Sequence, residues 1–427
     1  MIFFQLPKNN NIDLFKNIEY KFDNVYSFPA ISYSLSYYLN NIKEQINDIE
    51  GEWDIYKKYT NPFEYIHTTI PSFINMNHND YNIQSVSGFP PRIINCYGGE
   101  RRTNEYAGKN VSQYKPLSRS FFKMIEILKM FYIFDGITSE TSYAISSNIP
   151  LPPLGIKTFH LAEGPGGFIE AVVKLRNNPN DIYIGMTITD NKNPNVPSWK
   201  KSTKFLKNNK NVFIETGFDK TGDLLNIQNF KHCVKKYGST MHFITADGGF
   251  DFSSDFNSQE TTIVKLLFAQ VAFAVCMQKR GGSFVLKIFD SFHLHTIDIL
   301  YLLSSFYERV YICKPQTSRV ANSEKYIVCL GFLFDSNVEF YPYFYYCFES
   351  MNNYFNYYTT RILNVPVSNF FLVKLEEYNA IFGQQQIENI FNTIQLIKTK
   401  SKNKQEKIKS IVKHNIQKSV VWCNRYL

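Results

Sequence analysis

Four charged residues in the middle of the chain are spaced so that they could share one acid–base site. Lys123 lies in a stretch with helical spacing, and Glu324 directly precedes an apolar run typical of a buried strand. Asp247 and Lys287 each end a similar run. Ligands of an open α/β sheet bind beyond the carboxyl ends of its strands, so we expect Asp247 and Lys287 to meet there. Two amines and two carboxylates in one place can orient a hydroxyl group and accept its proton.

Taken one at a time, these residues have ordinary explanations. A lysine after a strand is usually exposed to solvent, Asp-Gly-Gly is usually a turn, and the four together also suit a buried ion-pair network without turnover. A lysine accepts a proton only when it is neutral, and a second cation together with partial desolvation favours the neutral form. The residues alone do not decide whether Lys123 or Lys287 is the base. We expect the two carboxylates to orient the amines and the hydroxyl.

A glycine-rich turn between a strand and a helix predicts a second part of the site. Residues 160–176 read HLAEGPGGFIEAVVKLR. Glycine lets the backbone approach a ligand closely, and the first turn of a helix offers N–H groups without partners. A dinucleotide site would have the spacing G-x-G-x-x-G and an acidic residue after the second strand. Here the spacing is G-P-G-G and only Asp190 follows, late, so we expect a different ligand against this turn.

Apolar runs that alternate with helical segments predict an α/β fold. Such continuous runs favour a mostly parallel sheet with helices on both faces. Residues 258–280 should form a long covering helix that stops at Gly281 and Gly282. Around this central part, residues 96–335, we expect accessory regions at 1–95 and at 336–427, the latter aromatic and then basic and helical over 387–417. The seven predicted strands are 157–162, 181–188, 211–216, 241–247, 282–289, 309–315 and 325–334.

The composition is that of a globular protein in a reducing compartment. Hydrophobic residues make up 44% of the 427 residues, which is enough for a buried core. The seven cysteines form no CxxC pair and no long run is free of polar residues, so we expect a soluble, cytoplasmic protein without a membrane partner. A net charge of +9 favours a polyanionic partner, although solubility alone also explains it. His293 and His295 lack a third ligand at metal-binding spacing, so we expect no metal.

Four ordered motifs carry a resemblance to a known family. They are AEGPGGF (162–168), TADGGF (245–250), GGSFVLKIFD (281–290) and KPQTSRVANSEKY (314–326). With the Lys–Asp–Lys–Glu order, the chain resembles the FtsJ-like ribose 2′-O-methyltransferases, and their cap-type branch in particular, over about residues 100–335. The resemblance implies a Rossmann-like fold with a seven-stranded sheet and methyl transfer from S-adenosylmethionine to a ribose 2′-hydroxyl of RNA. It points to the 5′ cap region of mRNA, at the first or second transcribed nucleotide.

The resemblance also assigns roles to residues. It implies that Lys287 is the proton acceptor among the four catalytic residues. It places the methionine and ribose of S-adenosylmethionine against the glycine turn, and Asp223 in KTGDLLN (220–226) is a further contact or simply a turn residue. The implied cofactor contacts are Glu163, Gly164, Pro165, Gly166, Gly167, Phe168, Asp223 and Asp247. The implied RNA contacts are Arg102, Asn257, Gln259, Arg319 and Asn322.

Two alternatives remain at this point. The first keeps the chemistry and changes the RNA to rRNA or tRNA, as in the short FtsJ branch. The second is an RNA-binding or transcription-associated subunit that keeps the fold without catalysis. The length, the AT-rich codon preference and the flanking regions also resemble FtsJ-like proteins of large cytoplasmic DNA viruses. That resemblance implies the host cytoplasm, a viral factory or the virion as location, and other capping or transcription proteins as partners.

Overall fold

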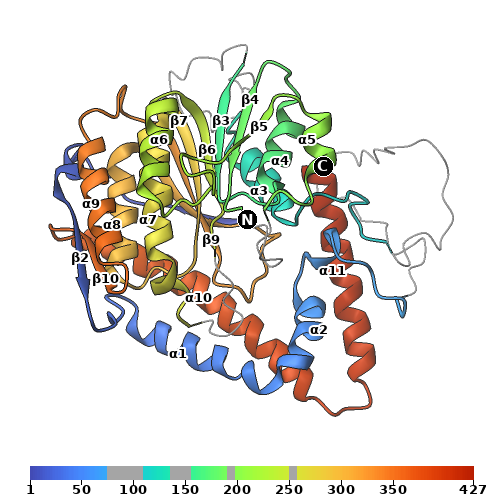
Figure 1. Cartoon of the computed structure of the whole chain (residues 1–427). Helices are drawn as coiled ribbons and strands as arrows, with labels where there is room; N and C mark the ends of the chain where they lie inside the picture. The colour runs from blue at the N-terminus through green and yellow to red at the C-terminus, as the bar shows by residue number, and fades with distance from the viewer. Residues whose placement is uncertain (75–108, 135–154, 190–197, 250–256) are drawn as a thin grey trace.

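A single mixed sheet forms the centre of the computed structural model, which describes residues 1–74, 109–134, 155–189, 198–249 and 257–427 (Figure 1). Its eight strands have the order β1-β8-β9-β7-β6-β3-β4-β5. Strands β3 to β7 run parallel to one another, whereas β9 runs antiparallel to β7 and β8, and β1 antiparallel to β8. The predicted mostly parallel α/β sheet is therefore confirmed. The strands are β1 (Ile2–Gln5), β3 (Lys157–Leu161), β4 (Ile182–Met186), β5 (Val212–Glu215), β6 (Met241–Ala246), β7 (Gln278–Ile288), β8 (Tyr307–Lys314) and β9 (Lys325–Phe332).

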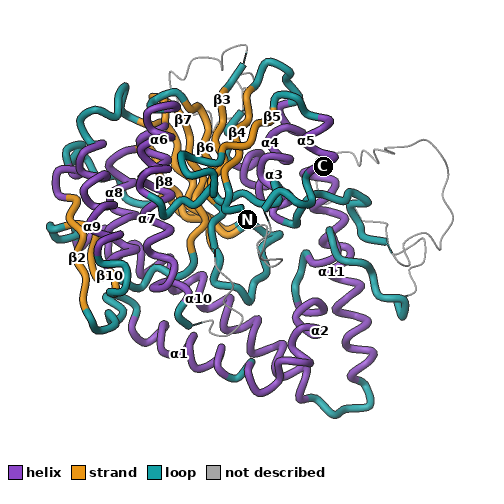
Figure 2. Tube along the Cα trace, viewed as in Figure 1, coloured by secondary structure: helices purple, strands orange, loops and turns teal. Residues whose placement is uncertain are grey.

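Helices cover both faces of the sheet (Figure 2). One face packs against α3 (Ser120–Met130), α4 (Gly167–Arg176) and α5 (Thr203–Asn208). The other packs against α6 (Ile227–Tyr237), α7 (Gln259–Met277), α8 (Leu294–Phe306) and α9 (Tyr341–Asn353). Helix α7 is long and apolar enough to cross a membrane, but 83% of its apolar window is buried inside the protein. It therefore serves as the central core helix, which explains why its sequence is apolar on every side.

The two terminal regions pack against each other. Helices α1 (Tyr33–Glu44) and α2 (Glu50–Thr60) lie against α10 (Asn369–Lys398), and α2 also contacts α11 (Lys404–Tyr426). Ile42, Trp53 and Ile390 share one buried cluster between these helices. Strand β2 (Ile18–Asp23) pairs antiparallel with β10 (Tyr358–Leu363) as a second, two-stranded sheet. The short 3₁₀ helices are η1 (Leu14–Asn17), η2 (Asn47–Ile49) and η3 (Glu64–Ile66). The boundaries of the three predicted regions stay a prediction.

Two expectations about the elements differ from the structure. The sheet has an eighth strand, because β1 of the N-terminal region joins its edge beside β8. The long covering helix ends at Met277, and Gly281 and Gly282 lie inside β7, where Gly281 has a φ of +74° and the pairing with β6 shifts register nearby. The basic stretch 387–417 is helical as expected and is divided between two helices, since α10 ends at Lys398 and α11 begins at Lys404.

Candidate active site

The four residues predicted to act together meet at the carboxyl edge of the sheet. The amine Nζ of Lys123 lies 2.7 Å from Oε1 of Glu324. The amine Nζ of Lys287 lies 2.7 Å from the carbonyl oxygen of Asp247 and 3.2 Å from its Oδ1. The hydroxyl of Tyr326 stands between the two pairs, 3.5 Å from Nζ of Lys123 and 3.5 Å from Oδ1 of Asp247. The site is thus two lysine–carboxylate pairs bridged by a tyrosine.

Strand register explains how these side chains come together. Asp247 follows the last residue of β6 directly, and Leu286 of the parallel strand β7 pairs with Ala246 of β6. Lys287 is therefore next to Asp247 at the same edge. Lys287 also pairs with Tyr326 of the antiparallel strand β9, so Glu324 lies at the entrance of β9 beside them. Helix α3, which carries Lys123, supplies the remaining amine from one face of the sheet.

Burial and neighbouring charges shift the pKa values of Lys123 and Glu324. Desolvation lowers the pKa of Lys123, and the carboxylates of Glu324 and Asp247 only partly oppose it. For Glu324, burial alone would raise the pKa, but the charges of Lys123 and Lys287 and hydrogen bonds from Lys123 and Ser318 outweigh it and hold the pKa below its ordinary value. Glu324 therefore stays ionised. The side chains of Lys287 and Asp247 keep 12% and 19% exposure, so a substrate can reach them.

The glycine turn opens α4 at the neighbouring strand end. Gly166 has a φ of +109°, a conformation that favours glycine, and the Gly164–Pro165 peptide is cis. Oε1 of Glu163 accepts hydrogen bonds from the backbone N–H groups of Phe168 (2.6 Å) and Ile169 (3.1 Å). Its other oxygen, Oε2, is buried and has no hydrogen-bond partner among the described residues. Burial raises the pKa of Glu163 well above its ordinary value, and the nearby Asp247 adds to this.

The glycines themselves are required by the protein's own packing. A Cβ on Gly164 would lie 2.8 Å from the backbone oxygen of Ser198, and one on Gly167 would collide with the hydroxyls of Ser118 and Ser120. On Gly166 it would lie 3.2 Å from Cδ1 of Leu117. These contacts give the glycines a packing reason of their own, and the expected close approach to a ligand stays a prediction. Among the described residues, Oε2 of Glu163 and Nε1 of Trp199, whose ring packs beside Gly166, are buried without a hydrogen-bond partner.

Asp223 sits in a tight turn near the end of β4. Its Oδ1 accepts the backbone N–H of Leu225 at 2.9 Å, and the preceding Gly222 packs against the backbone oxygen of Thr187. The turn residue explanation thus accounts for its side chain, and a cofactor contact stays a prediction. Asp190, the other acidic residue considered after β4, lies outside the described residues.

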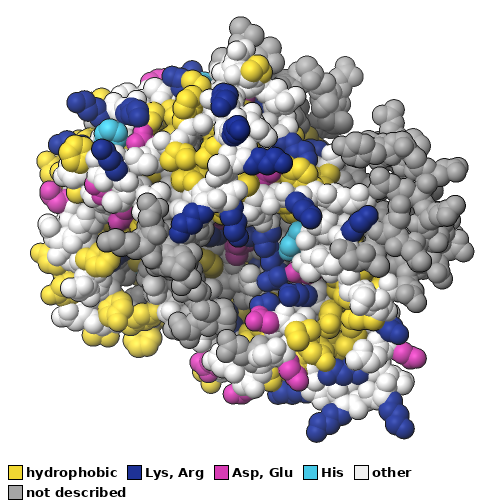
Figure 3. All heavy atoms as spheres, turned by 45° about the vertical axis from the view of Figure 1, so that its right-hand side comes forward, with side chains coloured by type: hydrophobic (Ala, Val, Ile, Leu, Met, Phe, Trp, Pro, Cys, Tyr) yellow, Lys and Arg dark blue, Asp and Glu magenta, His cyan; other side chains and the backbone are white. Residues whose placement is uncertain are grey.

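The guanidinium of Arg319 forms an ion pair with the N-terminal region. Its Nε and one terminal nitrogen donate to both carboxylate oxygens of Glu64 in η3, at 3.0 Å and 2.6 Å. Burial raises the pKa of Glu64, but the hydrogen bonds and charge of Arg319 dominate and lower it to about 2. Asn322 is exposed, and its carbonyl and that of Glu324 accept hydrogen bonds from Lys314. Arg102 lies outside the described residues. Figure 3 shows Lys and Arg side chains gathered along a hollowed face of the molecule.

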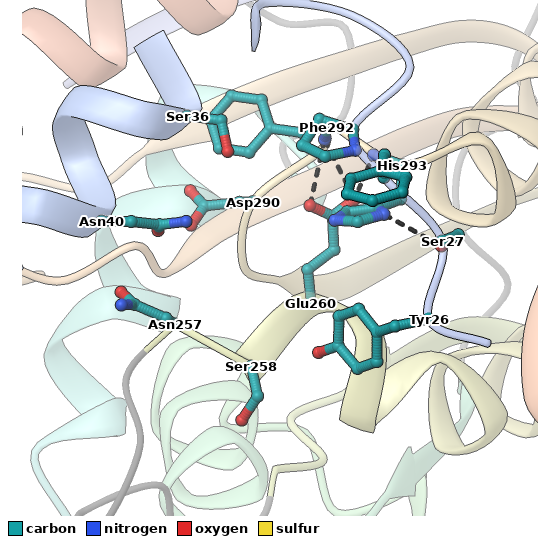
Figure 4. A pocket seen from close by; sticks show the side chains of 12 residues that line it. Tyr26, Ser27, Ser36, Asn40, Asn257, Ser258, Glu260, Asp290, Phe292 and His293 are labelled. Atoms are coloured by element: carbon teal, nitrogen blue, oxygen red, sulfur yellow. Dashed lines mark hydrogen bonds between the residues drawn. The ribbon is translucent and has the colours of Figure 1, made fainter. Parts of the chain in front are cut away.

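A pocket of about 420 Å³ adjoins this site (Figure 4). Asn257 lines it, whereas Gln259, the first residue of α7, does not. In its wall the buried carboxylate of Glu260 accepts the backbone N–H groups of Phe292 and His293, and burial raises the Glu260 pKa to about 7. The lining residues are Tyr26, Ser27, Phe28, Pro29, Ser36, Asn40, Asn257, Ser258, Glu260, Asp290, Phe292 and His293.

Ionic and ring contacts complete this wall. Asp290 is held between Lys43 of α1 (3.2 Å) and Lys325 of β9 (3.1 Å). The rings of His293 and His295 stack with centroids 5.3 Å apart, and Ser27 bonds to Nδ1 of His293. Within the described ranges, no group of three or more His, Cys, Asp and Glu residues has the arrangement of a metal site. The expectation that no metal binds stays a prediction.

Sequence reasoning missed the site residues contributed by the N-terminal region. Glu64, which fixes Arg319, and Lys43, which contacts Asp290, lie in a segment without a recognisable motif. No signal in the sequence pairs them with residues more than two hundred positions away. Tyr326 could have been predicted from the sequence, because it ends the KPQTSRVANSEKY motif. It pairs with Lys287 across the sheet, and paired residues have their side chains on the same side of the sheet.

Comparison with known proteins identifies the fold family. The family model of the FtsJ-like methyltransferases matches residues 116–332, just over half of the 427 residues. The chain belongs to this family. The predicted Rossmann-like methyltransferase fold is therefore confirmed, with eight strands in place of seven. All four motifs and all four catalytic candidates fall inside the matched residues.

Relatives of this family member carry names of cap-modifying enzymes. The cap-specific mRNA (nucleoside-2′-O-)-methyltransferase 1 of Trypanosoma cruzi is 32% identical over 219 residues, which cover 51% of this chain and 57% of the relative. The corresponding methyltransferase 2 of Pongo abelii is 29% identical, over 60% of this chain and 34% of the relative. The chain thus spans between about a third and just over half of these relatives' lengths. A Plasmodium falciparum protein described as a ribosomal RNA methyltransferase overlaps with a TM-score of 0.34 and 16% identity, over 51% of this chain and 98% of that one.

Proposed function

We propose that this FtsJ-like chain transfers a methyl group from S-adenosylmethionine to a ribose 2′-hydroxyl in the 5′ cap region of mRNA. The observation that carries the proposal is the pair of lysine–carboxylate contacts at the carboxyl edge of the sheet, beside the glycine turn. A 2′-hydroxyl is a weak nucleophile at neutral pH, so the protein has to position it and remove its proton. The names of the relatives support the cap region as the target.

Lys287 has the geometry of the proton acceptor. A neutral amine has two N–H groups and one lone pair. Its two oxygen neighbours among the described residues, both from Asp247, are positioned to accept the two N–H groups, at 2.7 Å and 3.2 Å, which leaves the lone pair for the hydroxyl proton. Lys123 instead lies 2.7 Å and 2.8 Å from the two oxygens of Glu324, so it supports the arrangement as a paired cation. These contacts favour Lys287 over Lys123, which the residue types alone left open.

Residues around the glycine turn fit the cofactor. S-adenosylmethionine supplies, when bound, a methyl group on a sulfonium that needs only an in-line nucleophile. Oε2 of Glu163 is a buried oxygen without a hydrogen-bond partner among the described residues, so it can accept a hydrogen bond from an amine or hydroxyl of the cofactor. Asp247 lies at the end of the adjacent strand β6, at the point where the strand order reverses. We assign Glu163 as the protein's leading cofactor contact, and Asp247 as a secondary contact whose main role is to hold the Lys287 amine.

The pocket beside Asp290 supports recognition of a capped end. Its volume of about 420 Å³ is within the range of small-ligand pockets, and aromatic rings of Tyr26, Phe28 and Phe292 line it together with polar groups. A flat purine can stack on such rings. Asp290 lies three residues after Lys287, so a base held here would leave the first transcribed nucleotides near the catalytic lysine.

The proposal is tested by incubating the protein with labelled S-adenosylmethionine and short RNAs that carry either a cap or a 5′-triphosphate. We expect faster methylation of capped RNA, with resistance to alkaline cleavage at one nucleotide near the 5′ end, because cap contacts supply the positioning. Equal rates, or preferred labelling of structured ribosomal RNA, would instead support an rRNA or tRNA enzyme. Tight cofactor binding without transfer to any RNA would support a non-catalytic subunit.

Partners and location follow from this activity. Capped mRNA is the substrate, and other capping or transcription proteins are the partners that supply it. We place the protein in the cytoplasm, in agreement with its resemblance to proteins of large cytoplasmic DNA viruses. Co-purification with capping activity from cytoplasmic extracts tests both statements.

A further inference from the structure

Almost all of the net positive charge of the chain lies in one stretch near its C-terminal end. Residues 398–425, which are the last residue of α10, the turn after it and most of α11, contain eight lysines and one arginine but only one glutamate. Their net charge is +8, whereas the whole chain has a net charge of +9. Charges that keep a protein soluble are spread over its surface with both signs mixed. This concentration instead indicates a polyanionic partner at one place.

Helix α11 arranges part of this charge along one side. Its apolar residues are buried toward α2, α3 and η3. Lys407, Lys418 and Arg425 are eleven and seven residues apart, and at about 3.6 residues per turn these spacings bring them onto one side of the helix. They span about 27 Å, at about 1.5 Å per residue. With three lysines at the end of α10 and in the next turn, they form what we call the basic strip, namely Lys398, Lys400, Lys402, Lys407, Lys418 and Arg425.

The side chains of the basic strip are available to a ligand. Five of the six residues are exposed, and Lys418 is half-buried. Within the part of the chain that the structure describes, none of the six forms an ion pair with a carboxylate. Lys404, in contrast, packs against the protein, because its Nζ donates to the carbonyl oxygen of Ile397 at 2.8 Å and lies 4.7 Å from the centre of the Tyr56 ring.

The inner end of the basic strip lies beside the helix that carries a catalytic lysine. Trp422, three residues before Arg425, donates from Nε1 to Oε2 of Glu126 at 3.2 Å. Glu126 lies in α3, three residues after Lys123. Figure 1 shows α11 running from there away from the sheet to the bottom of the view, where the turn from α10 lies. A polyanion that leaves the catalytic residues can therefore follow the strip outward.

The chemistry of the strip suits a single-stranded nucleic acid. A membrane-binding helix inserts its apolar side into the lipid, whereas α11 has that side buried within the protein. A protein interface needs aromatic or apolar anchors at its centre, and the six residues of the strip offer none. Cations that follow the backbone of a single strand bind it irrespective of its base sequence.

We propose that the basic strip binds phosphates of the RNA downstream of the methylated nucleotide. This inference rests on the proposed function, because it takes RNA as the substrate. The strip lies outside residues 116–332, which match the family model. It does not touch the reacting ribose, so it lowers the KM of long RNA and leaves kcat unchanged. The protein thus prefers a long capped transcript to a short capped fragment.

The test compares capped RNAs of about 5 and about 40 nucleotides in the triple variant Lys407→Gln, Lys418→Gln and Arg425→Gln. For the wild-type protein we expect a lower KM for the long RNA. In the variant the KM of the long RNA should rise about 10- to 100-fold at about 0.1 M salt, because each phosphate contact of a single strand contributes about 0.7 to the slope of log K against log salt. That slope should fall by about 2. The KM of the short RNA and both kcat values should change little.

A matched control removes three exposed lysines elsewhere, in the variant Lys231→Gln, Lys235→Gln and Lys279→Gln. The first two belong to α6, on the face of the sheet away from α3, and the third lies at the end of β7 away from Lys287. Calorimetric binding of S-adenosylmethionine shows whether each variant is folded. If the first variant does not fold, the triple variant with glutamine at the positions of the three outer lysines replaces it, namely Lys398→Gln, Lys400→Gln and Lys402→Gln. A smaller rise in KM is then expected.

Equal KM values of the two RNAs in the wild-type protein, or the same rise in the strip and control variants, would overturn the proposal while leaving the methyltransferase activity intact. Fluorescence anisotropy with the long RNA measures binding without turnover. The strip is therefore tested even if no RNA is methylated, a result that overturns the proposed function alone. Unchanged RNA binding together with lost binding of polyglutamate would assign the strip to an acidic protein and contradict the proposal.

Discussion

Replacing Lys287 with arginine separates proton acceptance from positive charge. Arginine keeps the charge but is not deprotonated near neutral pH. The space around the amine is also restricted on one side, because Nζ of Lys287 lies 2.7 Å from the carbonyl oxygen of Asp247. A guanidinium is larger than an ammonium, so it would not keep this contact in the same geometry. We therefore expect Lys287→Arg to be as impaired as Lys287→Ala.

The expected loss follows from what a positioned base contributes. General base catalysis is worth about 10²- to 10⁴-fold in rate, so kcat should fall by about that factor, or about 3–5 kcal/mol in activation free energy. Single-turnover transfer from labelled S-adenosylmethionine to capped RNA measures the rate, and calorimetry measures cofactor affinity, which should change little. Lys279→Arg is the control, since Lys279 is an exposed residue of the same strand.

The reasoning would be refuted by an active arginine variant. If Lys287→Arg keeps a rate within tenfold of the wild-type protein while Lys287→Ala does not, positive charge and not proton acceptance is the contribution of this residue. Lys123 would then be the remaining amine that could act as base. Equal activity of all three proteins would remove Lys287 from the reaction.

Three further predictions concern neighbouring carboxylates. Asp247→Ala should reduce kcat about 10²-fold or more with a smaller change in cofactor affinity, because it removes a partner of the Lys287 amine; single-turnover rates and calorimetry separate the two effects. Glu163→Gln should weaken S-adenosylmethionine binding in calorimetry while the melting temperature changes little, because an amide oxygen can still accept the two N–H groups that open α4. Glu64 has a folded pKa of about 2, below its ordinary 4.5, so its contribution to stability is present above about pH 4.5 and is lost as the pH falls toward 2. Chemical denaturation should show that Glu64→Gln removes up to about 3 kcal/mol of this acid-dependent stability.

The sequence made the meeting of the catalytic residues predictable because strand ends can be read from apolar runs. Asp247 and Lys287 end two neighbouring parallel strands, and parallel strands place their carboxyl ends at one edge. The choice of partners was not predictable. Whether Lys123 binds Glu324 or Asp247 depends on where α3 packs against the sheet, and that packing is set by buried side chains far apart in sequence.

The misread elements have local causes. Strand β1 has only four residues, too few for an alternating pattern to stand out, and it forms because β8 offers an open edge. Gly281 and Gly282 resemble a helix stop, but the residues from Gln278 onward continue the pairing with β6. There the positive φ of Gly281 accommodates an irregular part of the strand instead of a helix end.

The N-terminal region is a structural part of the site, although it lies outside the residues that match the family. Glu64 holds Arg319, and Lys43 shares Asp290 with Lys325, which directly follows Glu324. Removing one member of a buried charge pair typically costs about 3–5 kcal/mol, because the other charge is left without a partner. The orientation of the family's catalytic motif in this chain therefore depends on charges supplied by a segment outside the residues that the family model matches.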